Sequence, residues 1–286
     1  GRVIMTNSIE IKGLCKEYPG FTLGPVDLTL PGGAILGLIG ENGAGKTTLI
    51  KTMLGVARAD AGSIRLLGEE AALAKDEVGV VLDDCFFYEG LRLKDVSTVL
   101  RGVYSKWDED LFAAYLDRFG LGGKKTIKAL SRGMRMKLSL AAALAHRPRL
   151  LVLDEATAGL DPVVRDEILD EFLAFVCDEE HAVLISSHIT SDLEKVADYI
   201  AYLHRGKLLL FEEKDSLLER YGRLVCGAAD LERVDGALLA GVRRGQFSCE
   251  ALVRDRESFS RSYPRLQVER VSLDDIMVFM NRRDKA

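Results

Sequence analysis

The first segment that could carry chemistry is a glycine-rich run, Gly40-Glu41-Asn42-Gly43-Ala44-Gly45-Lys46-Thr47. It has the spacing GxxxxGK followed by Thr, between an apolar run and a helical pattern, as this phosphate-binding motif requires. Glycines let the backbone curl so that successive N–H groups face a phosphate, and the following helix adds its positive end. Lys46 is expected to contact the outer phosphates and the Thr47 hydroxyl to contact magnesium. The nucleotide-binding residues expected here are Asn42, Gly43, Ala44, Gly45, Lys46, Thr47 and Thr48.

Two adjacent carboxylates, Asp154 and Glu155, directly follow the apolar run Leu150–Leu153. Asp154 is suited to hold magnesium, and Glu155 is suited to orient or deprotonate an attacking water. Such a pair at a strand end often only solvates a turn, so alone it is weak support for a site. Together with the phosphate-binding loop, it favours a site that hydrolyses a nucleotide.

The elements that must position these residues alternate between strands and helices. Residues 8–39 indicate short strands with turns, of which the unalternating run Ala34–Ile39 is typical of a buried parallel strand. A helix should follow the glycine loop and stop at Gly55. Further buried strands are expected at Leu150–Leu153 and Ala182–Ser186.

A helical insertion separates the phosphate loop from the carboxylates. Residues 92–147 have helical periodicity throughout, with Val99 and Val103 among the apolar positions. After the third strand the pattern predicts a hairpin and then a small α+β region from about residue 216. The elements expected there are strands at Tyr199–Leu203, Lys207–Phe211, Leu224–Cys226 and Leu266–Val271, and a helix at Leu273–Met280.

Composition and charge limit the class of protein. The chain has 286 residues, 48% hydrophobic and 29% charged, which suits a globular protein of two units. No apolar run approaches the roughly 18 residues that cross a bilayer, and the first five residues lack a signal-peptide layout. We therefore expect the protein to lie in the cytoplasm. Five widely spaced cysteines indicate neither a disulfide framework nor a zinc site. The net charge of −5 does not favour nucleic acid as a partner.

Three further segments resemble motifs of one family. Leu130-Ser131-Arg132-Gly133-Met134 resembles the LSGGQ signature of ABC ATPases, Ala158-Gly159-Leu160-Asp161 resembles their D-loop, and Ser186-Ser187-His188 resembles their switch-histidine segment. The likeness covers about residues 8–212. It implies an α/β fold: a P-loop NTPase (RecA-like) core with an antiparallel β-subdomain, a helical subdomain at about 86–149 and a small C-terminal α+β extension. The expected domains are 6–215, the ATPase domain, and 216–286, an accessory region.

The resemblance also assigns roles to single residues. Ser131 and Gly133 are expected to contact the γ-phosphate bound by the opposite protomer, with Asp161 in the D-loop. His188 is expected to sense that phosphate through Glu155. Tyr18 is the expected aromatic ring that stacks on adenine, and Phe21 is the alternative. Ser131 also suits a helix N-cap, and Asp161 suits one with Pro at the next position.

Three positions depart from the family pattern. Arg132 replaces the first signature glycine, and Met134 replaces the glutamine. Asp83 stands where the Q-loop glutamine is expected. A carboxylate there could bind magnesium directly or through water, and the alternative is a solvated loop residue.

The resemblance implies an ATPase that uses ATP and Mg²⁺, closes as a homodimer or heterodimer, and powers a separate transmembrane permease, as in bacterial exporters. Such a subunit lies peripherally on the inner face of the cell membrane. The alternative is a soluble ABC ATPase that acts on ribosomes or DNA, but those relatives generally carry two cassettes or a long coiled-coil insertion. A GTPase or a small-molecule kinase would explain the phosphate loop alone, without the signature.

Overall fold

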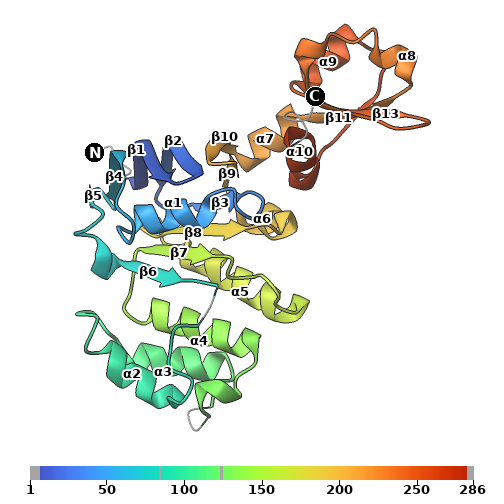
Figure 1. The fold of residues 1–286 in the computed structure, drawn as a ribbon. Helices are drawn as coiled ribbons and strands as arrows, with labels where there is room; N and C mark the ends of the chain where they lie inside the picture. Colours follow the sequence, from blue (N-terminus) through green and yellow to red (C-terminus); the bar gives the residue numbers. More distant parts are fainter. Residues whose placement is uncertain (1–6, 84, 123–124, 282–286) are drawn as a thin grey trace, which may run out of the picture.

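The computed structural model describes residues 7–83, 85–122 and 125–281. Within these ranges the chain forms three sheets, and helices pack on them (Figure 1). Among the same residues, no helix is both long and apolar enough to span a bilayer.

The central sheet has six strands in the order β10-β9-β3-β8-β7-β6, and every neighbouring pair is parallel except β9 and β10. Parallel strands covered on both faces are apolar without alternation, which explains the buried runs seen in the sequence. Register aligns Ile39 with Ser187 and Asp154 with Ser186, so these carboxyl ends meet at one edge. The strands are β3 Ile35–Ile39, β6 Val78–Val81, β7 Leu150–Asp154, β8 Ala182–Ser187, β9 Tyr199–His204 and β10 Lys207–Glu213.

Each face of the central sheet has its own hydrophobic core. Along β7, Leu150 and Val152 pack into the cluster that contains helix α1 (Lys46–Met53). Leu151 and Leu153 pack into the cluster that contains the other large helices. These are α4 Arg132–Leu144, α5 Pro162–Phe175 and α6 Thr190–Val196. Helices α1 and α4 therefore lie on opposite faces of the sheet.

An antiparallel sheet, in the order β2-β1-β4-β5, completes the core around α1. The prediction of short strands was wrong here, because β1 has 12 residues and β2 has 11. Shifts of register let glycines lie inside the pairing: Gly24 has φ 101°, and a Cβ on it would lie 2.0 Å from the Leu14 carbonyl oxygen. The strands are β1 Asn7–Tyr18, β2 Phe21–Pro31, β4 Ala61–Leu66 and β5 Glu69–Glu70.

The helical block has a separate core, built mainly by α2, α3 and α4. The prediction of helix throughout was wrong after α3, where the described residues form only a 3-10 turn before α4. It was also wrong between residues 101 and 108, because α2 ends at Leu100 and leaves Val103 64% exposed. There the Tyr104 ring stacks on the His146 ring with centroids 4.0 Å apart. Helix α3 ends at Arg118, just before Gly120 (φ 66°). The elements of this block are α2 Leu93–Leu100, α3 Glu109–Arg118 and the 3-10 turn η2 Ile127–Ala129. A further 3-10 turn, η1 Lys75–Glu77, directly precedes β6.

The C-terminal region forms a sheet in the order β12-β13-β11-β14, with α8 and α9 covering one face. Figure 1 shows it beyond β10 and α7, with α10 at the junction. The predicted hairpin and terminal helix are confirmed. The elements are α7 Lys214–Arg220, β11 Gly222–Cys226, α8 Ala228–Leu231, η3 Gly236–Leu238, β12 Leu239–Arg244, β13 Cys249–Val253, α9 Arg256–Ser262, β14 Val268–Glu269 and α10 Leu273–Met280.

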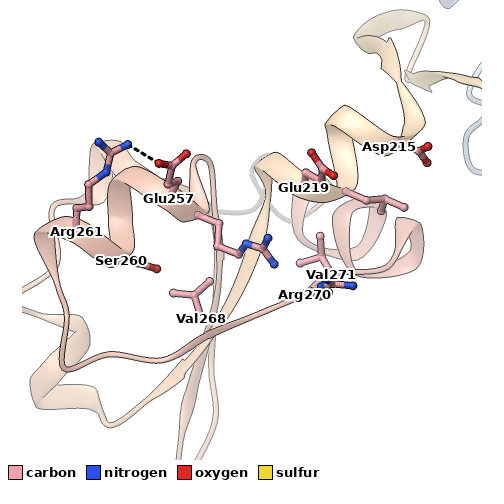
Figure 2. Close-up of a pocket in the computed structure, with 10 residues that line it drawn as sticks. Asp215, Glu219, Glu257, Ser260, Arg261, Val268, Arg270 and Val271 are labelled. Atoms are coloured by element: carbon pink, nitrogen blue, oxygen red, sulfur yellow. Dashed lines mark hydrogen bonds and ion pairs between the residues drawn. The ribbon is translucent and has the colours of Figure 1, made fainter.

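A cavity of about 960 Å³ lies between α7, α9 and β14. Figure 2 shows Glu219 on the α7 side, and Arg261 paired with Glu257 on α9. The charges of its lining side chains balance, with three carboxylates and three guanidinium groups. Its lining residues all come from 215 onward, so it is separate from the phosphate loop.

The five cysteines differ in exposure. Cys177, just after α5, is exposed, Cys249 is buried, and the other three are intermediate. Cys226 on β11 lies directly opposite Cys249 on β13, and burial raises the pKa of the Cys226 thiol. All five are free thiols in the structure.

Candidate functional site

The glycine loop leaves β3 and curls before α1 begins at Lys46. Gly43 (φ 81°) and Gly45 (φ 109°) adopt left-handed backbone angles that favour glycine, and Ala44 N–H donates to the Glu41 carbonyl at 3.0 Å. The buried Lys46 ammonium donates to the Gly40 carbonyl at 2.7 Å. A cavity of about 290 Å³ opens over the loop, lined by Phe21, Glu41, Asn42, Gly43, Gly45, Lys46, Thr47, Thr48 and Glu155.

Asp154, the last residue of β7, lies beside Thr47 in the first turn of α1. The Thr47 hydroxyl donates to Asp154 Oδ2 at 2.7 Å, and the buried Ser186 hydroxyl donates to Oδ1 at 2.5 Å. A hydroxyl beside a buried carboxylate is an oxygen donor set suited to magnesium. These residues therefore fit a magnesium–nucleotide complex, with Lys46 and the curled backbone as the phosphate-binding side.

Glu155 is held in a strained backbone conformation, with φ 53°. Non-glycine residues at such angles cluster at functional sites because the surrounding structure must hold them there. Its N–H donates to the Ser186 carbonyl and hydroxyl, each at 3.1 Å. Its carboxylate lies 2.7 Å from His188 Nδ1 and 3.1 Å from Lys46 Nζ, the second contact being an ion pair without hydrogen-bond geometry. The structure thus brings together the two residues predicted as catalytic.

Ser186 is a site residue that the sequence did not single out for a role of its own. Its side chain bonds both Asp154 and the backbone of Glu155. The available signal was a serine at the end of an apolar strand, Ala182–Ser187, in a chain that already showed a phosphate loop.

Two aromatic rings near the loop could stack on a base. Phe21 lines the phosphate-loop cavity, and a Cβ on Gly45 would lie 2.9 Å from its Cζ. Tyr18 pairs with Phe21 across the β1–β2 turn, but its ring is exposed and lies 5.0 Å from Lys16 Nζ. Stacking by Tyr18 stays a prediction, and of the two rings Phe21 is the one that lines the phosphate-loop cavity.

The signature serine begins a helix, as predicted. Ser131 Oγ accepts from Met134 N–H at 3.3 Å, and Asp161 caps α5 by accepting from Val163 N–H and Val164 N–H at 3.1 Å. A Cβ on Gly133 would lie 3.2 Å from Val164, so the signature packs on the start of α5. Across residues 7–83, 85–122 and 125–281, no hydrogen bond or ion pair joins Ser131 or Gly133 to the phosphate loop.

Two of the three departures from the family pattern, Arg132 and Asp83, contact each other. Arg132 donates to Asp83 Oδ1 at 2.7 Å, with both side chains about half exposed. A Cβ on Gly159 would lie 3.2 Å from the Arg132 guanidinium carbon. Arg132 therefore joins the Q-loop, the signature and the D-loop within one chain. Magnesium binding by Asp83 stays a prediction, and its partner here is a guanidinium group.

Comparison with known proteins agrees with this geometry. A family model described as "ABC transporter" matches residues 23–158. The lantibiotic transport ATP-binding protein SrtF of Streptococcus pyogenes is 36% identical over 215 residues, covering 72% of this chain and 91% of the relative. The bacitracin transport ATP-binding protein BcrA of Enterococcus faecalis is 36% identical over 217 residues, 72% of this chain and 70% of that one.

A solved structure described as an ATP-binding subunit of an ABC transporter superposes with a TM-score of 0.67 at 26% identity. It covers 73% of this chain and 91% of that one. The strand order, the phosphate loop and the paired carboxylates agree with these similarities. The chain belongs to the ABC transporter family, as an ATP-binding and ATP-hydrolysing subunit.

Proposed function

We propose that this ATPase works as a head-to-tail dimer in which each ATP is bound by the phosphate loop of one protomer and by Ser131 and Gly133 of the other. The observation that carries the proposal is the position of α1 and α4 on opposite faces of the central sheet. Among the described residues of one chain, the sheet lies between the two helices and no hydrogen bond or ion pair joins Ser131 to Lys46. A second copy can supply the missing signature, and the partner is this chain or a related one.

The proposed roles follow from the contacts within one chain. Lys46 holds the outer phosphates, and Thr47 and Asp154 hold the Mg²⁺, which supplies charge neutralisation at the phosphates when bound. Glu155 accepts the proton of the attacking water, and His188 holds the carboxylate through the 2.7 Å contact at Nδ1. Phosphate binding to Lys46 competes with the 3.1 Å ion pair to Glu155, so it leaves that carboxylate available to the water.

The proposed task is export by a transporter whose membrane-embedded permease is a separate chain, with this subunit held at the inner face of the membrane. The names of SrtF and BcrA, which refer to lantibiotic and bacitracin transport, support a peptide-like substrate. These similarities do not favour a ribosome- or DNA-directed ATPase.

Two exposed aromatic side chains support a permease contact. Phe86 is 76% exposed and Tyr88 is 77% exposed, and both follow Asp83 in the chain. Replacing both by Asp should reduce co-purification with the permease from native membranes. Phe247, 93% exposed on the C-terminal region, is the matched control, and Phe247→Asp should leave co-purification unchanged. Equal recovery of the permease by both variants would contradict this contact.

Subunit mixing tests the shared site. Lys46→Ala and Ser131→Arg should each abolish hydrolysis as homodimers. In a 1:1 mixture with random exchange, half of the dimers are mixed, and each has one site free of both changes. The mixture should therefore recover about one quarter of wild-type phosphate release, since half the dimers carry half the sites.

The controls are Lys51→Ala, which changes an exposed lysine on the same helix as Lys46, and ATP-dependent dimer formation measured by size exclusion. Lys51→Ala should keep wild-type activity. If exchange is demonstrated and neither phosphate release nor dimer formation returns, the shared-site arrangement is wrong.

A further inference from the structure

The C-terminal region reaches the phosphate loop through one side chain. Asn281, directly after α10, donates from Nδ2 to Glu41 Oε1 at 2.6 Å, and its Oδ1 accepts from the Tyr202 hydroxyl on β9. Glu41 is the second residue of the phosphate loop. The amide orientation is fixed chemically, because only its NH₂ group can donate to a carboxylate. The contact therefore joins two segments 240 residues apart in the sequence.

The position of Asn281 is fixed by the packing of α10. Ile276, Met277 and Phe279 are buried in the same hydrophobic cluster as the helices of the central sheet. At the start of α10, Ser272 and Asp275 form a capping box, and Leu273 N–H donates to the Glu194 carboxylate on α6. Both ends of α10 are thus bonded to the ATPase core, and Asn281 is presented to Glu41 by a docked helix.

Glu41 shapes the loop with its backbone while Asn281 holds its side chain. The Glu41 carbonyl accepts from Ala44 N–H at 3.0 Å and from Lys46 Nζ at 3.4 Å. The carboxylate is also the acidic side chain of a loop that must bind an anion, so its orientation affects the local field at the phosphates. A restraint on this side chain therefore acts on both the curl of the loop and its charge.

We propose that Asn281 is a positioning residue for ATP binding, which restrains Glu41 and makes the C-terminal region part of the nucleotide site. Movement of α10, by a partner or ligand of the C-terminal region, then changes ATP affinity through this hydrogen bond. The proposal rests on the ATP-binding function of the loop. It adds that residues 222–281 regulate the affinity of that loop for ATP.

The test compares ATP dissociation constants and steady-state kinetics of full-length variants. Asn281→Ala should raise the dissociation constant for ATP about three- to tenfold, with kcat at saturating ATP within about twofold. This is less than the roughly 10- to 150-fold of a lost hydrogen bond to a charged group, because Asn281 acts on ATP only through Glu41. Asn281→Asp should weaken binding further, because two carboxylates then face each other. Asp274→Ala, an exposed change on the same helix, is the matched control and should bind ATP as wild type does.

A double-mutant cycle separates positioning from general damage. With Glu41→Ala already present, adding Asn281→Ala should cause no further loss, because the partner is gone. Wild-type affinity in Asn281→Ala, additive losses in the double variant, or an equal loss in Asp274→Ala would overturn the proposal. Lys46→Ala tests the underlying function separately: if that variant binds ATP normally, the ATP-site assignment fails instead.

Discussion

Removing the Ser186 hydroxyl should impair catalysis although the residue does not reach the nucleotide cavity. Ser186→Ala deletes one buried oxygen, which donates to Asp154 Oδ1 at 2.5 Å and accepts from Glu155 N–H at 3.1 Å. The Glu155 N–H keeps its bond to the Ser186 carbonyl, so the main loss is the bond to the carboxylate. A hydrogen bond to a charged group contributes about 1.5–3 kcal/mol, and a loss of that size at the transition state slows turnover about 10- to 150-fold.

The assay is phosphate release as a function of ATP and Mg²⁺, with thermal unfolding measured in parallel. The Mg²⁺ concentration for half-maximal activity should rise, because Asp154 loses the group that orients it. Ser187→Ala is the matched control: that hydroxyl accepts from Ile189 N–H at 2.9 Å and has no bond to Asp154 or Glu155. If Ser186→Ala keeps wild-type turnover and metal dependence, or if Ser187→Ala loses as much, the assigned role of Ser186 is refuted.

Three further predictions concern single groups. Glu155→Gln keeps the shape but cannot accept a proton, so hydrolysis should fall at least about 100-fold while ATP binding and the ATP-dependent dimer on size exclusion persist; undiminished phosphate release would remove Glu155 from the mechanism. If Asp83 contacts magnesium, Asp83→Ala should raise the Mg²⁺ needed for half-maximal activity; an unchanged requirement would leave only its exposed pair with Arg132, which contributes about 0.2–1 kcal/mol to folding. Burial lowers the pKa of His146 from its ordinary 6.5, against weaker opposing effects of Val78 and Ala142 backbone groups, so the unfolded chain binds this proton more readily. The free energy of unfolding should therefore fall as the pH drops below about 6.5 towards the folded pKa, and His146→Phe should flatten that dependence in urea titrations between pH 7 and 5; an unchanged slope would assign the dependence to other groups.

Local sequence patterns predicted the chemistry of the site because each motif is contained in a short segment. The glycine spacing predicts a curled loop, and an apolar strand before two acids predicts where the acids lie. Thr47 and Asp154 are 107 residues apart. They could be expected to meet because each lies at or just beyond the carboxyl end of a parallel strand. The division at residue 215 stays a prediction.

Contacts that depend on strand order could not be predicted in the same way. Ser186 meets Asp154 because β7 and β8 are neighbours in register, a pairing that no local pattern contains. The φ of Glu155 and the contact between Asn281 and Glu41 likewise arise from tertiary packing. Periodicity places Val103 on a helix, but Val103 lies beyond the end of α2 and is exposed, because periodicity alone does not show where a helix ends.

The distribution of cysteines makes the native protein easy to label. Cys177 is the exposed thiol among the five, whereas Cys249 is buried and burial keeps the Cys226 thiol protonated over a wider pH range. A maleimide fluorophore should therefore attach first at Cys177, without any cysteine being removed. This position follows the last turn of α5, the helix that Asp161 caps beside the proposed dimer interface. Energy transfer between Cys177 dyes on two protomers would follow ATP-driven closure and reopening in real time.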